Sequence, residues 1–97
     1  MTLEELENIF DKYDEDYLEF DKIQNKLSIR RDLHAFLLLD KLSPSKKCII
    51  SAAEHDEFFL DAQPEDVLEN ITEDDIYELV CCGVMYRGSE CCFCMFS

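Results

Sequence analysis

Apolar residues near the start of the chain follow the period of an α-helix. From Leu3 onward they recur at alternating steps of three and four, which places them on one side of a helix. Thr2 and Glu5 form a Ser/Thr-x-x-Glu capping box at its start. The spacing continues through the three acids at 14–16 and predicts one long helix ending near residue 24. Its predicted buried stripe consists of Leu3, Leu6, Phe10, Tyr13, Tyr17 and Phe20.

A second helix is predicted after a connection at residues 25–31. Asp32 is a candidate N-cap, and the residues from Leu33 to Leu42 are apolar on almost every side. Such a helix is expected to lie at the centre of the core. Pro44 ends the helix, because the residue before a proline avoids the α region.

Two short apolar runs, 48–51 and 58–60, are rich in strand-forming residues and predict a pair of strands. Residues 51–54 offer an alternative, because they could instead form a helical turn. Beyond this pair, Pro64 suits the first turn of a short helix that ends at Asn70.

A last helix and a hairpin are predicted for the rest of the chain. Thr72 and Asp75 form an acidic variant of the capping box for a helix that ends at Cys82, and Gly83 supplies the left-handed residue after it. In that helix Ile76, Leu79 and Val80 are expected to be buried, and the acids 73–75 and 78 to point to water. Residues 84–86 and 91–96 predict a terminal β-hairpin.

The order of the predicted elements indicates the fold class. Helices and strands alternate in pairs, as ααββααββ, which favours an antiparallel sheet over a doubly wound parallel one. We therefore expect an α+β protein in which residues 1–97 form one domain, with an antiparallel sheet of about four short strands covered by three or four helices.

The net charge of the chain limits the kinds of partner that it can bind. The chain carries 23 acids and nine bases, a formal net charge of −14, which argues against direct binding to nucleic-acid phosphates or anionic lipid. The distribution is uneven: residues 1–21 sum to about −8, residues 22–47 to about +5, and the rest to about −11. We call residues 22–47 the basic segment.

The two acidic blocks suggest a protein partner. Carboxylates three or four residues apart on a helix lie roughly 5–6 Å from one another, a charge density comparable to that of duplex DNA. One hypothesis is therefore an inhibitor that imitates nucleic acid and occupies a basic groove of another protein. The alternative is that these acids only form a solvated, solubilising face. The candidate partner-binding residues are Asp11, Asp14, Glu15, Asp16, Glu19, Glu73, Asp74, Asp75 and Glu78.

A second function remains open, in which the chain is a structural or regulatory adaptor. Its first helix would then pair with a partner, or with a second copy of the chain, through the heptad-like apolar stripe.

Three motifs resemble chemical sites but fail in their details. Residues 11–22 resemble a calcium loop, yet Tyr13, Asp16 and Lys22 occupy places that need an oxygen ligand, a glycine and a bidentate carboxylate. The cysteines at 81–82 and 91–94 lack the Cys-x-x-Cys spacing of zinc sites and read as small apolar core residues. We expect His34 to be a hydrogen-bonded histidine in the core and His55 to be a polar residue on the surface. We therefore expect no metal, no cofactor and no enzymatic activity.

Three segments resemble small acidic proteins of tailed bacteriophages: residues 32–40, 49–57 and 71–96. This resemblance implies expression in the cytoplasm of a bacterial host, where the partner would be a host or defence protein. The sequence itself agrees with that compartment, because acids occupy the place of a basic signal-peptide region and the longest apolar run is Ala35–Leu39. In that reducing environment the six cysteines are expected to be free thiols.

Overall fold

The computed structural model describes residues 1–96 and confirms the α+β class. These described residues form four α-helices, two 3₁₀ turns and four strands. In chain order these are α1 (Leu3–Lys12), η1 (Asp14–Asp16), η2 (Phe20–Lys22), α2 (Arg31–Leu42), β1 (Ile50–Glu54), β2 (Glu57–Leu60), α3 (Pro64–Asn70), α4 (Glu73–Cys82), β3 (Val84–Arg87) and β4 (Cys92–Phe96).

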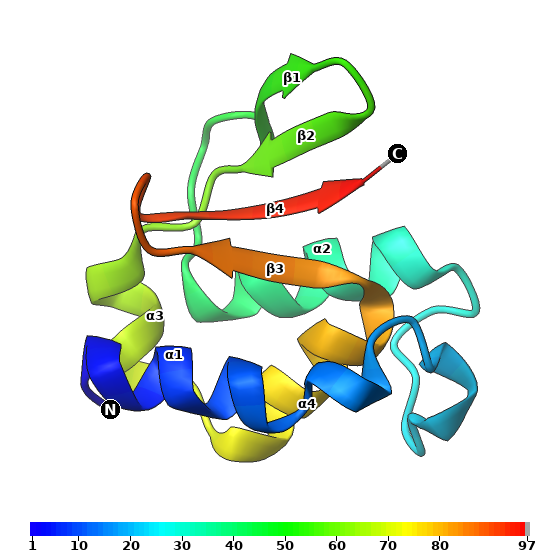
Figure 1. Ribbon diagram of the computed structural model, residues 1–97. Helices are drawn as coiled ribbons and strands as arrows, with labels where there is room; N and C mark the ends of the chain where they lie inside the picture. Colours follow the sequence, from blue (N-terminus) through cyan, green and yellow to red (C-terminus); the bar gives the residue numbers. More distant parts are fainter. Residues whose placement is uncertain (97) are drawn as a thin grey trace.

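The strands form one antiparallel sheet in the order β1-β2-β4-β3. β4, the last strand in the sequence, therefore lies between β2 and β3. The helices gather on one side of this sheet, and the β1–β2 hairpin extends beyond them (Figure 1). Both predicted hairpins are confirmed, although β1 begins at Ile50 rather than Cys48 and residues 51–54 are strand rather than a helical turn.

The core lies between the sheet and α4, which packs against both α1 and α2. Phe93 of β4 is fully buried, with its ring centroid 6.2 Å from that of Phe10 in α1 and 5.2 Å from that of Tyr86 in β3. Leu6, Leu39 and other large side chains are also fully buried and complete this core. One strand residue thus joins the sheet to the first helix.

The first helix is much shorter than predicted, because α1 ends at Lys12 rather than near residue 24. Two of the three residues at 14–16 are aspartates, and aspartate is a weak helix former. The chain instead makes two 3₁₀ turns, with Leu18 at a φ of 67°. The backbone N–H of Leu18 donates to the Val80 carbonyl at 3.2 Å, which holds this segment against α4.

The apolar stripe of the first segment nevertheless faces the core. Leu6 is buried, and the aromatic members of the stripe are half-buried against the core cluster. Leu3 is the exception, because 38% of its surface is exposed.

The second helix differs from its prediction at both its start and its outer side. Arg30 is the N-cap residue and makes no side-chain cap, whereas Asp32 lies inside the first turn and accepts from the Leu33 N–H. Leu33 and Leu37 are each 41% exposed, so α2 is not apolar core on every side. Ser43 follows its end, as predicted from the proline at 44.

The two capping boxes and the final glycine are confirmed. The N–H of Glu5 donates to Thr2 Oγ1 at 3.1 Å, and the N–H of Asp75 donates to Thr72 Oγ1 at 3.2 Å. Gly83 ends α4 with a φ of 92°, and a Cβ there would lie 2.6 Å from Leu18 Cδ2. This helix therefore has a fixed start and a fixed end.

His34 is a fully buried core histidine, as predicted. Its Nδ1 accepts from the Leu27 N–H at 3.0 Å, and its Nε2 lies 2.9 Å from Glu78 Oε1. The first bond makes Nδ1 the acceptor, so Nε2 carries the proton that it donates to the carboxylate. Glu78 is half-buried by this contact, which corrects the prediction that it points to water.

Candidate functional site

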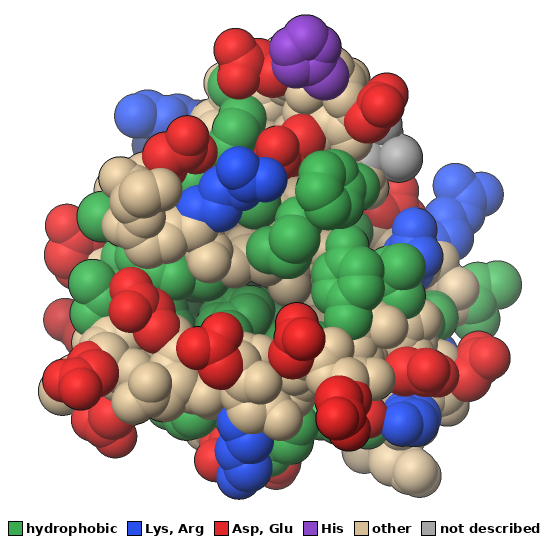
Figure 2. Space-filling model, in the orientation of Figure 1, with side chains coloured by type: hydrophobic (Ala, Val, Ile, Leu, Met, Phe, Trp, Pro, Cys, Tyr) green, Lys and Arg blue, Asp and Glu red, His purple; other side chains and the backbone are tan. Residues whose placement is uncertain are grey.

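The first acidic block forms an exposed row along α1 and the turns that follow it. The side chains of Asp11, Asp14, Glu15 and Glu19 are exposed and make no hydrogen bond or ion pair within residues 1–96. We call these four residues the acidic row. Figure 2 shows acidic side chains along the lower part of the molecule, where Figure 1 places α1, beneath apolar side chains that lie over the strands.

A groove of about 270 Å³ separates the acidic row from β3, the strand at one edge of the sheet. Asp11 and Asp14 lie on one side of it, and Arg87 lies on the strand side. Aromatic and aliphatic side chains complete its lining: Phe10, Tyr17, Val80, Val84, Met85 and Tyr86. The structure thus places carboxylates of the row directly beside aromatic surface.

Burial changes the acidity of the tyrosines at this groove. It raises the pKa of Tyr86 to about 12, with a smaller contribution from the nearby Cys91 thiol, and it also raises the pKa of Tyr17. Both phenols are therefore neutral at pH 7 and present uncharged aromatic surface next to the carboxylates.

The other candidate acids mostly have partners within the chain. Glu73 binds Lys12 and accepts from the Tyr13 hydroxyl at 2.8 Å, and Asp16 forms an ion pair of 2.8 Å with Lys22. Asp75 closes the capping box of α4, and Glu78 accepts from His34. Of the acids in α4, Asp74 is the one that stays exposed with no side-chain partner among residues 1–96.

Contacts between α1 and α4 bring the two blocks together at one place. Lys12 Nζ lies 3.3 Å from Glu73 Oε2, and the rings of Tyr13 and Tyr77 meet edge to face at 5.1 Å. The hydrogen bond from Tyr13 and the Lys12 ammonium both lower the pKa of Glu73. Since Lys12 neutralises this carboxylate, the contact joins the two helices and adds little to the acidic surface.

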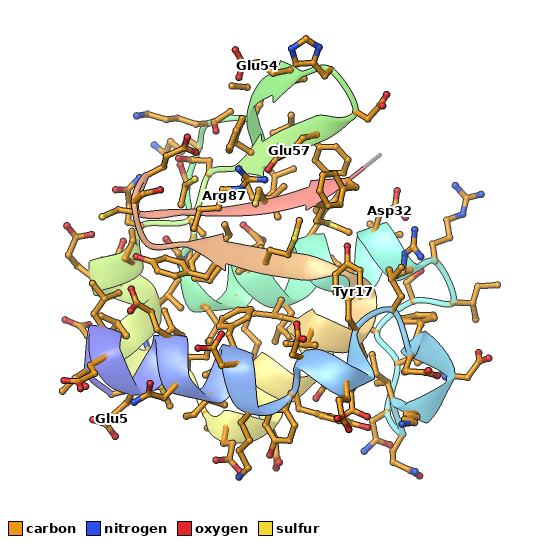
Figure 3. The ribbon with its side chains drawn as sticks, in the orientation of Figure 1. Glu5, Tyr17, Asp32, Glu54, Glu57 and Arg87 are labelled. Atoms are coloured by element: carbon orange, nitrogen blue, oxygen red, sulfur yellow. The ribbon has the colours of Figure 1, made fainter. Side chains whose placement is uncertain are left out.

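A separate polar cluster lies on the side of the sheet that the helices leave open. The side chains of Glu57 and Arg87 point toward each other across β4, where Arg87 Nη2 lies 2.6 Å from Glu57 Oε1 (Figure 3). In the sheet register Glu57 lies opposite Phe96 and Arg87 lies opposite Cys92, so Cys94 is midway between their two positions along β4, and it is fully buried. This ion pair neutralises Arg87, the single base after residue 48.

Two further features of the structure concern metal binding and membrane insertion. Across residues 1–96, no group of three or more His, Cys, Asp or Glu side chains is arranged to hold a metal ion. The segment that resembles a calcium loop contains the two 3₁₀ turns and the Asp16–Lys22 ion pair. No helix within the described part of the chain is long and apolar enough to span a bilayer.

We expect thiol reagents to divide the six free cysteines by their exposure and acidity. Cys48 and Cys91 are exposed, whereas burial raises the pKa of Cys82 to about 12 and that of Cys94 to about 11. Only a thiolate attacks such a reagent, so at pH 8 Cys48 and Cys91 should react first. Labelling of the native protein with a chromogenic disulfide should show a fast phase of these two thiols.

Replacing both exposed cysteines by serine should remove that fast phase and leave the slow reaction. Rapid labelling of all six thiols would contradict the packing of Cys82 and Cys94.

The groove beside the acidic row is not apparent from the sequence. Phe10 and Tyr17 were predicted as core, and Tyr86 and Arg87 as parts of a hairpin. Which strand would lie at the edge of the sheet depends on the position of β4, and no local pattern in the sequence indicates it.

No protein-family model, curated protein or solved structure matches this chain. A functional proposal therefore has to rest on the surface itself.

Proposed function

We propose that this chain is a phage-encoded acidic inhibitor that binds a basic, nucleic-acid-binding surface of a host or defence protein. The observation that carries the proposal is the acidic row, whose carboxylates are exposed and have no side-chain partner within residues 1–96, and two of which, on Asp11 and Asp14, border an aromatic groove. The resemblance to small acidic phage proteins suggests the host, and the net charge of −14 suggests a basic partner.

The row and the groove would have different roles in such a complex. Exposed carboxylates attract a basic surface over a distance of about one Debye length and raise the rate of association. Aromatic side chains give most of the binding energy at protein interfaces once water is excluded. Phe10, Tyr17 and Tyr86 lie where they would supply this contact.

The adaptor hypothesis has less support. It requires the apolar stripe of the first helix to be available to a partner, but Leu6 is buried and the ring of Tyr13 packs against that of Tyr77 in α4. Pairing through that stripe would require α1 to leave α4 and β3.

Charge reversal tests the proposal once a partner has been retained from a bacterial lysate on the immobilised protein. The variant Asp11→Lys, Asp14→Lys and Glu15→Lys should weaken binding to that partner by more than about tenfold, because reversing charges at an interface makes them repel the partner. Wild-type binding should compete with duplex DNA and weaken steeply as salt rises.

A matched variant separates the position of the charges from their number. Glu54→Lys, Glu65→Lys and Glu69→Lys change the net charge by the same amount at exposed sites on β1 and α3. This control should keep most of the affinity. Equal affinity of the two variants, absence of competition with DNA, or failure to retain any basic protein would contradict the proposal.

A further inference from the structure

The outer side of α2 carries apolar residues that no other element covers. His34, Ala35, Leu38, Leu39 and Leu42 are buried, whereas Leu33 and Leu37 are exposed on the opposite side of the helix. Ile29, just before the helix, is 91% exposed. A cluster of exposed aliphatic side chains on a small, highly charged protein indicates an interaction surface.

Two opposite charges flank the exposed leucines at helical spacing. Leu33, Leu37 and Asp40 follow one another at steps of four and three, which puts them on one stripe of the helix, and Arg30, the N-cap residue, precedes Leu33 by three. We call these four residues the α2 stripe. Arg30 and Asp40 are exposed, and neither side chain makes a hydrogen bond or an ion pair with the described residues.

The four residues of the α2 stripe are, in order, basic, apolar, apolar and acidic. The stripe is therefore complementary to the same stripe of a second copy that runs in the opposite direction. In an antiparallel pair of α2 helices, Leu33 of each copy lies against Leu37 of the other. The same arrangement places Arg30 of each copy against Asp40 of the other. A two-fold symmetric contact uses one surface twice, so a single stripe supplies two ion pairs and two leucine contacts. In a parallel pair Arg30 would face Arg30, and Asp40 would face Asp40.

The charge of the whole chain favours this surface for self-association. Two copies at −14 repel each other, and this repulsion is smallest where the facing surfaces carry no net local charge. The α2 stripe meets this condition, because its one base, Arg30, and its one acid, Asp40, balance each other. Because α4 packs against both α1 and α2, contact through the outer side of α2 leaves the acidic row of each copy free.

Apolar surface also continues beside the stripe. A groove of about 260 Å³ lies between α2 and the segment that leads into β1, and Phe36 and Ile49 are part of its lining together with Leu33 and Leu37. A stable interface needs about 800 Å² from each partner, which is more than one helix face provides. The groove widens the available contact.

We propose that two copies of this chain associate through antiparallel α2 helices, with Leu33 and Leu37 at the centre and Arg30–Asp40 ion pairs on both sides. This inference is independent of the proposed inhibitor function, because it uses a different surface and is tested without a partner protein.

Analytical ultracentrifugation over a range of concentrations tests the proposal directly. The mass of the wild-type protein should rise from 11.4 kDa toward twice that value as concentration increases. Leu37→Glu should keep the protein monomeric, and circular dichroism should show that the variant is folded, because its side chain is already exposed. Leu3→Glu introduces the same charge at an exposed leucine of α1 and should leave dimer formation unchanged.

Charge exchange tests the antiparallel arrangement. Arg30→Asp alone and Asp40→Arg alone should each weaken the dimer by about tenfold, since like charges then face each other twice. The double variant Arg30→Asp, Asp40→Arg should restore the wild-type affinity. An equimolar mixture of the two single variants should also dimerise, because each charge then meets its opposite.

Three results would overturn the proposal. A monomer at every concentration excludes the dimer, and a dimer lost in Leu3→Glu but kept in Leu37→Glu assigns the contact to α1. A dimer that both single charge variants leave unchanged excludes the antiparallel register, because a parallel pair already places like charges opposite each other.

Discussion

Replacing Phe93 by alanine is expected to destabilise the protein by about 3–5 kcal/mol, a large part of the stability of a small domain. Phe93 is fully buried on the middle strand, and its ring contacts those of Phe10 and Tyr86. The substitution leaves a cavity where the sheet meets α1, and the surrounding structure relaxes only partly into such a space. Thermal unfolding followed by circular dichroism should show a midpoint lower by more than about 12 °C.

Phe96 provides the matched control, because it is the same residue type on the same strand but is 51% exposed. Phe96→Ala should cost less than about 1 kcal/mol. Similar midpoints for the two variants would mean that the ring of Phe93 does not hold the sheet against α1.

Replacing His34 by leucine should cost about 1–3 kcal/mol even though the side-chain volume hardly changes. The Leu27 N–H loses its acceptor in a part-buried place, and an unsatisfied donor of this kind costs about 1–3 kcal/mol. Glu78 loses its donor as well, but its half-buried carboxylate can take up water in exchange. Chemical denaturation should therefore show a lower midpoint with an unchanged slope.

Two variants distinguish hydrogen bonding from a general effect of replacing a histidine. Glu78→Gln keeps an oxygen that accepts from His34 Nε2 and should cost less than His34→Leu. His55→Asn changes the exposed histidine of the β1–β2 turn, where the φ of 54° suits asparagine, and should be nearly neutral. If His34→Leu were as stable as these two variants, the hydrogen bond with Leu27 would contribute nothing measurable.

The first segment shows what apolar spacing can and cannot predict. Its alternating three-four steps correctly identified Leu6, Phe10, Tyr13, Tyr17 and Phe20 as residues that face the core. They did not reveal that the helix stops at Lys12, because a 3₁₀ turn has nearly the same period as an α-helix. The weak helix propensity of Asp14 and Asp16 favours an end at this point, and the spacing of apolar residues does not report it.

The second helix shows a different limit. Its run of leucines indicates burial on every side, yet a helix at the border of a small fold has one side without a neighbour. Which side this is depends on where α4 packs, and that is a property of the tertiary arrangement. Leu33 and Leu37 were therefore expected in the core and are exposed instead.

The candidate acids were predictable as a group but not one by one. Charge counting identified both blocks, and the capping box of Thr72 already assigned a local role to Asp75. The partners of Glu73 and Glu78 lie 60 and 44 residues away in the sequence, on Tyr13 and His34. Contacts over such separations depend on the fold, so no local pattern separates these acids from those of the acidic row.

The position of β4 has a consequence for the order in which the protein can assemble during synthesis. β2 and β3 do not touch each other in the sheet, and β4 alone joins them. A nascent chain can form the β1–β2 hairpin and its helices early, but the sheet stays in two parts until residues 92–96 have left the ribosome. A premature stop between Arg87 and Cys92 therefore leaves β2 and β3 without the strand that pairs with both, and such open strand edges are templates for aggregation and targets for proteases.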